Sequence, residues 1–281
     1  MKLSQLLPSP LMQASALVHA GAVASLVRPQ LWPWALGTVV ADHLLLTACG
    51  LWPRSTLLGP NWTRLPHGAA ARGQIAITID DGPEPSVTPQ VLARLDERGV
   101  KATFFCIGER VARYPELARE VVQRGHAIEN HSQRHRTFFS LLGPRGIARE
   151  LSQAQDSIGA VTGSRPIFFR APAGLRNALL EPVLMSLGLR LASWTRRGFD
   201  TVVRDPRTVL AKLTRGLAAG DILLLHDGGA ARTPAGIPVI LEVLPRLLDA
   251  CAAASLTSVT LRSSAMPGIA AEVTGAAAAQ S

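Results

Sequence analysis

The chain is poor in aromatic residues and in cysteine. Aromatic residues fill only 5% of the 281 positions, so small and aliphatic side chains must build the core that a hydrophobic content of 47% allows. The three cysteines, Cys49, Cys106 and Cys251, form no CxxC pair and no even framework. We expect buried thiols that behave as small hydrophobes, and nothing here indicates an oxidising compartment.

Acidic residues are outnumbered by basic ones, and the net charge is +9. Such an excess attracts anionic lipid head groups or a phosphorylated substrate, although a generally Arg-rich composition would produce the same number. The sequence contains no basic run interleaved with aromatic residues and no nucleic-acid-binding motif. We therefore expect membrane lipid, and no nucleic acid, among the partners.

Three regions follow one another along the chain, and the length suits one catalytic domain plus an appendage. Residues 1–66 are apolar and almost free of acids, which predicts a membrane-anchoring helical hairpin. Residues 67–263 form the predicted folded domain. Residues 264–281 are Ala-rich and predict a disordered tail.

The hairpin is predicted from two apolar segments, 10–27 and 34–52, each close to the minimum length of a membrane-spanning helix. Tryptophans near the segment ends favour the membrane interface. Polar residues interrupt both segments, and a hairpin would let His19 pair with Asp42. The alternative is an interfacial pair of helices that never crosses. A secretory signal fits less well, because no clear cleavage site precedes the folded domain and a second apolar segment follows.

The distribution of basic residues predicts the orientation of this hairpin. Only Arg28 lies in the tight loop between the segments, whereas Lys2, Arg54, Arg64 and Arg72 lie on the other side. The positive-inside rule places that side in the cytoplasm. We therefore expect a protein of the bacterial inner membrane with its catalytic domain on the cytoplasmic face.

The folded domain alternates strand-like and helix-like segments, which predicts a parallel α/β fold, either a barrel or an open sheet. The predicted strands are 74–80, 101–107, 126–130, 167–170, 189–194, 222–226 and 255–261. The predicted helices are 87–98, 115–124, 146–161 and 239–253.

Polar residues follow several of these strands, where parallel α/β folds place their active sites. The apolar strand 74–80 ends in Asp80 and Asp81 before a Gly-Pro turn. Neighbouring residues leaving a strand point in different directions, so one carboxylate can face a metal while the other faces a water. The alternative is a simple Asp-Gly-Pro turn.

A pair of histidines, His131 and His135, follows the third strand. Histidines four residues apart on one face of a helical turn can bind one metal ion, although two solvated histidines in a basic loop would give the same pattern. With Asp81 they complete a set of three ligands, and three protein ligands with an open position are typical of catalytic zinc.

Three further clusters occupy later strand ends. Arg170 leaves a hydrophobic strand into a Pro/Gly turn and could hold a carboxylate, or it could belong to a surface turn. A fourth cluster spans 194–200. In the fifth, an apolar strand ends in His226, a candidate general acid where a lone histidine would more often be structural.

These five clusters, in this order and spacing, closely resemble the polysaccharide deacetylase family (NodB homology, carbohydrate esterase family 4) over roughly residues 73–262. The resemblance implies a distorted (β/α)7-type barrel and a divalent metal, usually Zn²⁺. It implies that Asp80 is the catalytic base, that Arg170 orients the base, that His226 is the acid and that Asp200 orients the acid. The implied metal ligands are Asp81, His131 and His135, and the implied substrate-binding residues are Ala173, Leu224 and Trp194.

The sequence departs from the family pattern in the substrate groove. Ala173 stands where an aromatic residue is frequent, although its backbone N–H could still serve an oxyanion. The fourth motif of the family usually reads Asp-x-x-Asp-Trp. Here Arg197 replaces its first Asp and Thr201 replaces its Trp, whereas Asp200 remains. These changes leave the chemistry intact but argue against an ordinary chitin or peptidoglycan groove.

The resulting expectation is a metal-dependent hydrolase that removes an N-acetyl or other N-acyl group from an amino sugar in a glycan or lipid-linked saccharide. One alternative is an O-acetyl esterase acting on a polysaccharide. In a non-catalytic glycan-binding module we would expect Asp80 or a metal ligand to be replaced, and all of these residues are present. A scaffold role for the hairpin has no positive support in the sequence.

Overall fold

An apolar run, Gln74–Gly82, forms the long central strand β1 of the computed structural model, which describes residues 8–265. Every pairing between named strands is parallel. The strands run in the spatial order β5 (Arg190–Leu191), β4 (Phe168–Phe169), β3 (Ala127–Asn130), β2 (Thr103–Cys106), β1, β7 (Ile222–His226) and β6 (Arg196–Arg197), with β8 (Thr257–Ser258) paired to the start of β1.

The two outer strands of this curved sheet, β5 and β6, do not pair, and a short extended segment lies in the gap between them. Trp62 makes a parallel bridge to Ala192 after β5, and Arg64 makes an antiparallel bridge to Asp221 before β7. The sheet is thus a distorted, incompletely closed barrel, in which the strand ends converge on one face.

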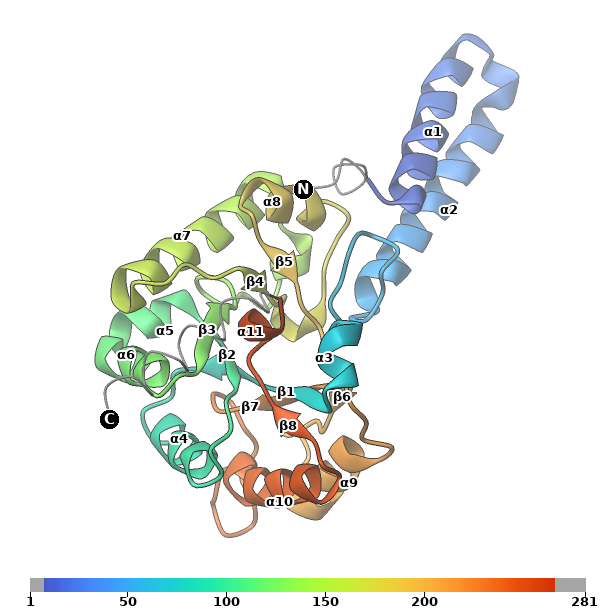
Figure 1. Ribbon diagram of the computed structural model, residues 1–281. Helices are drawn as coiled ribbons and strands as arrows, with labels where there is room; N and C mark the ends of the chain where they lie inside the picture. The colour runs from blue at the N-terminus through green and yellow to red at the C-terminus, as the bar shows by residue number, and fades with distance from the viewer. Residues whose placement is uncertain (1–7, 266–281) are drawn as a thin grey trace.

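Helices cover the outside of the sheet (Figure 1). They are α4 (Thr88–Asp96), α5 (Gly108–Arg113), α6 (Pro115–Gln123), α7 (Pro144–Thr162), α8 (Leu180–Ser186), α9 (Pro206–Thr214) and α10 (Val239–Ala253). Two short helices, α3 (His67–Ala71) and α11 (Leu261–Ala265), instead pack against the inner cluster of the barrel, to which Ala69 and Leu261 belong. Two short 3-10 turns, Phe139–Leu141 and Pro172–Gly174, follow β3 and β4.

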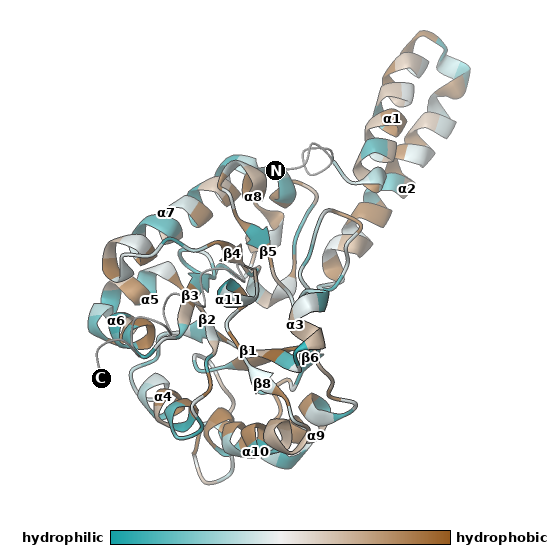
Figure 2. Cartoon of the chain, in the orientation of Figure 1, coloured by the Kyte–Doolittle hydropathy of each residue, from teal (hydrophilic) through white to brown (hydrophobic). Residues whose placement is uncertain are grey.

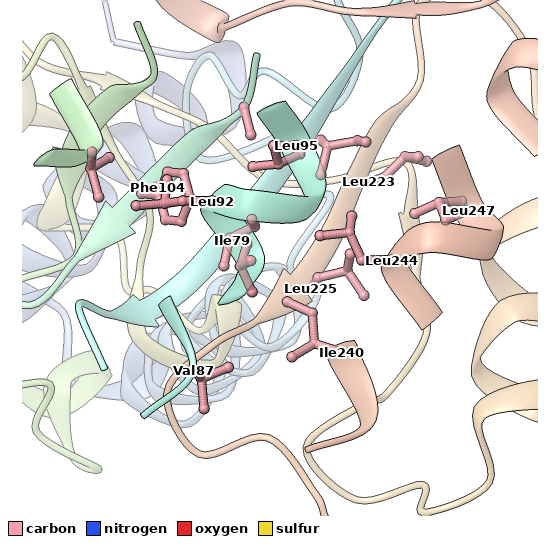
Figure 3. Packing of buried hydrophobic residues seen from close by; sticks show 14 of the residues in the cluster. Ile79, Val87, Leu92, Leu95, Phe104, Leu223, Leu225, Ile240, Leu244 and Leu247 are labelled. Carbon is pink, nitrogen blue, oxygen red and sulfur yellow. The ribbon is translucent and has the colours of Figure 1, made fainter. Parts of the chain in front are cut away.

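Side chains along β1 and β7 point alternately outward, into the hydrophobic core beneath the helices, and inward, into the interior of the barrel. Ile79 and Leu225 point outward and pack with Leu92 of α4 and Leu244 of α10 in a fully buried cluster (Figure 3). Successive residues of a strand face opposite sides of the sheet, so the intervening residues of β1 and β7 face the barrel interior. Truncating one of these buried leucines to alanine would cost about 2–5 kcal/mol.

The N-terminal segments form a hairpin that projects from one corner of the domain (Figure 1). Helix α1 (Pro10–Ala24) continues as a 3-10 turn to Val27, a second turn covers Pro29–Leu31, and α2 covers Trp32–Leu51. The two apolar stretches are 18 and 23 residues long, and most of their residues are not buried. Because a helix rises 1.5 Å per residue, even the shorter one reaches about 27 Å. The ribbon of the hairpin is coloured mainly brown to white, for hydrophobic to neutral residues, with a few hydrophilic positions in teal (Figure 2).

Polar side chains meet between the two helices of the hairpin. The ring nitrogen Nδ1 of His19 lies 3.8 Å from the carboxylate of Asp42, so the expected pairing of these residues is confirmed. Ser15 donates a hydrogen bond to Asp42 at 2.7 Å, and Nε2 of His19 lies 3.2 Å from Nε2 of His43. The polar side chains of Ser15, His19, Asp42 and His43 thus partner one another across the hairpin.

The predicted fold, a distorted α/β barrel preceded by a helical hairpin, is confirmed. The sequence pattern did not predict β6 or the helices α3, α5, α8, α9 and α11, because these elements are only two to nine residues long and give too short a periodic signal. Of the predicted tail, Ser264 and Ala265 belong to α11, and residues 266–281 lie outside the described residues, as do residues 1–7 of the hairpin region.

Candidate active site

The strand register brings the polar residues of β1 and β7 together inside the barrel. Thr78 pairs with Leu224, and Asp80 pairs with His226 two residues further along. Paired residues of neighbouring strands lie side by side on the same face. The sequence-predicted base and acid therefore stand next to each other at the carboxyl ends of the two central strands.

A bulge at the end of β1 separates the two adjacent aspartates. The register shifts between Asp80 and Gly82, and Asp81 adopts a left-handed φ of 74°. A bulge re-aims the side chain that follows it. Asp80 consequently faces the barrel interior beside His226, whereas Asp81 turns toward the loop after β3.

Asp81, His131 and His135 form one compact cluster whose ligand atoms all lie within 4.8 Å of one another. Oδ1 of Asp81 is 3.2 Å from Nε2 of each histidine, and this buried oxygen has no hydrogen-bond donor among the described residues. Nδ1 of His131 lies 2.8 Å from the carbonyl oxygen of Arg170, which accepts its proton and leaves Nε2 free to bind. Two imidazole nitrogens and one carboxylate oxygen fit a divalent cation.

The charges in this cluster hold Asp81 ionised. Burial by itself would raise the pKa of Asp81, but its close contact with His131 and the other charges around the cluster lower it well below its usual range. Burial and the neighbouring His131 lower the pKa of His135, so that its ring is neutral and able to act as a ligand.

The two histidines do not lie on a helical turn, as the sequence analysis expected. His131 follows β3 directly, and the chain then turns through left-handed conformations at Ser132 and His135. The amide of Ser132 donates to Asn130 at 2.9 Å, and the amide of His135 donates to the hydroxyl of Ser132 at 3.0 Å. The buried carboxylate of Glu150 accepts from the amide of residue 134, which fixes the turn from outside.

Arg170 is a fully buried cation that contacts the sequence-predicted base. Its Nη1 donates to Asp80 and to Thr78, each at 2.7 Å. The remaining donors reach the carbonyl oxygens of Ala192 and Ser193 at 3.2 and 2.7 Å. The guanidinium also lies 4.1 Å from the centre of the Phe105 ring. This network fixes one oxygen of Asp80 and leaves the other 3.8 Å from Nε2 of His131.

His226 forms a buried pair with Asp200. Nδ1 of His226 lies 2.9 Å from Oδ1 of Asp200, and the other carboxylate oxygen accepts the His226 amide at 2.7 Å. Burial lowers the pKa of His226, but the hydrogen bond and charge of Asp200, with the charges of Asp80 and Asp81, outweigh it and raise that pKa to about 9. The ring is therefore a protonated donor at neutral pH.

These groups open into one pocket of about 170 Å³. The pocket contains all of the sequence-predicted residues except Arg170 and Asp200, which lie behind Asp80 and His226. It is lined by Asp80, Asp81, His131, His135, Ala173, Gly174, Trp194, Arg197, Thr201, Leu224 and His226. Arg197 and Thr201, which the sequence analysis treated only as departures from the family pattern, are thus pocket residues.

Asp227 is a supporting residue to which the sequence analysis gave no role. Its side chain is buried, accepts hydrogen bonds from Thr88 and from the amide of Gly228, and lies against Gly82, where a Cβ would come within 2.6 Å. Burial raises the pKa of Asp227 to about 7. The available signal was a second polar residue directly after His226 at the end of an apolar strand.

Comparison with known proteins places the chain in a family. The polysaccharide deacetylase family model matches residues 67–192. A peptidoglycan-N-acetylglucosamine deacetylase from Bacillus cereus is 33% identical over 175 residues, which are 62% of this chain and 81% of that protein. A chitooligosaccharide deacetylase from Azorhizobium caulinodans is 35% identical over 167 residues, covering 57% of this chain and 79% of that one.

A solved structure gives the same result. A family 4 carbohydrate esterase from Streptomyces lividans, in complex with acetate, matches with a TM-score of 0.60 and 31% identity over 66% of this chain and 91% of that chain. The chain belongs to the polysaccharide deacetylase family. It is accordingly a hydrolase of the polysaccharide deacetylase type, in a family that generally uses a divalent metal.

Proposed function

We propose that this enzyme removes the N-acetyl, or another N-acyl, group from an amino sugar, with Asp80 as base and His226 as acid. The observation that supports this most strongly is the register that sets Asp80 beside His226, with Arg170 behind one and Asp200 behind the other. A fixed carboxylate and a protonated imidazole in one pocket are the two partners that amide hydrolysis needs.

Asp81, His131 and His135 are proposed to hold the divalent metal, with Zn²⁺ as the preferred ion because the donors are two nitrogens and one oxygen. When bound, such an ion supplies Lewis-acid polarisation of the substrate carbonyl. The unpartnered Oδ1 of Asp81, equidistant from both histidine rings, supports this assignment.

Other residues of the chain take the remaining catalytic roles. Arg170 orients Asp80 through its hydrogen bond, and Asp80 takes a proton from the attacking water. The amide N–H at Ala173, which lies on the pocket rim in a left-handed turn, is placed to donate to the developing oxyanion. His226 gives its proton to the departing amine nitrogen as the C–N bond breaks. Leu224 and Trp194 form the apolar wall for the acyl methyl group and the sugar.

The expected products are one carboxylic acid and one free amine per bond cleaved. Full-length enzyme, supplied with zinc and a chitooligosaccharide, should release acetate and an equal amount of primary amine, both measured by mass spectrometry. Acetate released without amine from an O-acetylated polysaccharide, together with inert N-acetylated substrates, would instead establish the O-acetyl esterase alternative.

We further propose a saccharide linked to a membrane lipid through phosphate as the natural substrate. Arg197 supports this: its guanidinium lies 5.4 Å from the Trp194 ring and 4.9 Å from the Phe199 ring at the pocket edge. Its Nε is buried and has no acceptor within the described residues. A cation held by aromatic rings with a spare donor suits an anionic group such as phosphate.

Replacing Arg197 with glutamine tests this assignment. Because a hydrogen bond to a charged group contributes about 1.5–3 kcal/mol, R197Q should raise KM for a phosphate-linked N-acetylglucosamine roughly 10- to 100-fold. kcat, and all constants for the neutral chitooligosaccharide, should change little. An equal loss on both substrates would show that Arg197 only supports the pocket wall.

The hairpin is proposed to span the bacterial inner membrane with the catalytic domain on the cytoplasmic face. Its two apolar helices are long enough, and the basic residues gather on the domain side. An impermeant thiol reagent added to spheroplasts should label Arg28→Cys and spare Arg54→Cys until the cells are lysed. The native cysteines, Cys49, Cys106 and Cys251, are buried and should therefore not react with the reagent. The reverse pattern would place the domain outside.

A further inference from the structure

The exposed apolar side chains of the domain are unevenly distributed. Within residues 52–265, all the large ones except Met185 lie at the root of the hairpin or on loops that follow β3, β4, β6 and β7. They are Trp52, Leu57, Phe138, Leu141, Leu179, Phe199, Val202 and Ile237. Leu141 and Val202 are the most exposed, at 82% and 75%. We call these segments, 52–61, 131–143, 171–179, 198–204 and 228–238, the apolar rim.

The exposed charged residues of the apolar rim are all basic. Its five segments contain one acid, Asp200, which is fully buried beneath His226. Its exposed charged residues are Arg54, Arg134, Arg204 and Arg232. By contrast, Glu97, directly after α4, and Glu116, on α6, are exposed acids in ion pairs with arginines. Exposed apolar side chains next to unpaired cations are typical of surfaces that meet an anionic bilayer.

The hairpin leaves the domain through this same rim. The carbonyl oxygen of Gly50, at the end of α2, accepts the amide of Arg176 at 3.1 Å, and a Cβ at Gly50 would collide with the Arg176 carbonyl. The next residues continue the contact, since Ser193 donates to the carbonyl of Pro53 at 2.9 Å. Helix α2 is thereby joined to the loop after β4, which also forms one wall of the pocket.

The mouth of the pocket is surrounded by the rim. Ala173 and Gly174 come from the loop after β4, Thr201 from the loop after β6 and His135 from the loop after β3. The root of the hairpin, the exposed apolar side chains and the mouth of the pocket therefore lie on one face of the domain.

We propose that the apolar rim lies on the surface of an anionic lipid bilayer, so that the active-site pocket opens toward the membrane and receives an amino sugar carried on a lipid head group. The inference rests on the proposed function in taking the hairpin as the membrane anchor and the substrate as a lipid-linked amino sugar. The occupant is the bilayer because the rim is continuous with the hairpin, and because its basic, acid-free surface complements anionic head groups.

The test uses full-length protein in nanodiscs of phosphatidylcholine and phosphatidylglycerol. A polarity-sensitive dye is attached to single introduced cysteines, Leu141→Cys and Val202→Cys on the rim, Met185→Cys on α8 as the matched exposed control, and Leu36→Cys in the hairpin. Spin-labelled lipid should quench the dye at 141 and 202 severalfold more than at 185. Discs of phosphatidylcholine alone should weaken the quenching at both rim positions.

The Leu36→Cys label separates the possible failures. Quenching at 36 with no more quenching at 141 and 202 than at 185 would overturn the docked rim while the anchor stands. Absence of quenching at 36 would refute the spanning hairpin, and with it the docked rim. Rim quenching in an enzyme that releases no acetate from any N-acetylated sugar would uphold the rim and refute the proposed reaction.

A second readout tests the consequence for the substrate. Leu141→Asp places a charge on the rim, and it should lower, severalfold, the ratio of activity on membrane-embedded lipid-linked N-acetylglucosamine to activity on soluble chitooligosaccharide. Met185→Asp should leave that ratio unchanged. An unchanged ratio in Leu141→Asp would contradict the membrane-facing pocket.

Discussion

Asp80→Asn is expected to lower kcat for deacetylation by about 10³-fold, within the usual contribution of a positioned general base. Asparagine keeps the shape of the side chain and can still accept the hydrogen bond from Arg170, which Asp80 accepts at 2.7 Å. It cannot take a proton from water. KM and metal content should stay close to those of the unchanged enzyme, because Asp81 and the two histidines are untouched.

The matched control is Asp156→Asn, which neutralises an exposed carboxylate on α7 that pairs with Arg165. It should leave kcat unchanged. Initial rates of acetate release from a chitooligosaccharide measure both variants. A kcat for Asp80→Asn within a few-fold of the parent enzyme would remove Asp80 from the role of base.

Arg170→Met is expected to lower the free energy of unfolding by about 3–5 kcal/mol, because it leaves the buried carboxylate of Asp80 without its cation. Arg170 is 1% exposed and Asp80 is 3% exposed, so water cannot replace the lost contact. Four hydrogen bonds from the guanidinium are removed at the same time. Urea unfolding in detergent micelles measures the change.

A double-mutant cycle tells this charge effect from simple loss of packing. Adding Asp80→Asn to Arg170→Met removes the stranded charge, so the double variant should be more stable than Arg170→Met alone. A double variant that is less stable than either single variant would mean that packing against Phe105 and the lost carbonyl contacts dominate instead.

Much of the site was predictable because short apolar strands end in polar residues. Parallel strands bring their carboxyl ends to one edge, so Asp80, Arg170 and His226 could be grouped from the sequence. The pairing of His226 with Asp200 came from the family resemblance, and the 2.9 Å contact now gives it a physical basis.

Other features depend on backbone geometry that no periodicity encodes. The turn that joins His131 to His135 uses left-handed residues and outside support from Glu150, whereas four-residue spacing indicates a helix. The bulge that separates Asp81 from Asp80 is a matter of strand register. The apolar rim could not be predicted, because its exposed apolar residues are isolated in separate loops of the sequence. They lie on one face only in the folded domain.

Metal content of the full-length protein is the most direct test of the proposed centre. The enzyme is purified in detergent, supplied with zinc and desalted, alongside Asp81→Ala/His131→Ala and a control, His19→Ala/His43→Ala. The control removes the other cluster of ligand-type residues in the described chain, formed with Asp42 in the hairpin. We predict roughly one tightly bound zinc ion per chain that the Asp81/His131 variant loses and the hairpin variant keeps. Equal metal in the parent and the Asp81/His131 variant, or none in any of the three, would contradict a metal-dependent deacetylase centre at this site.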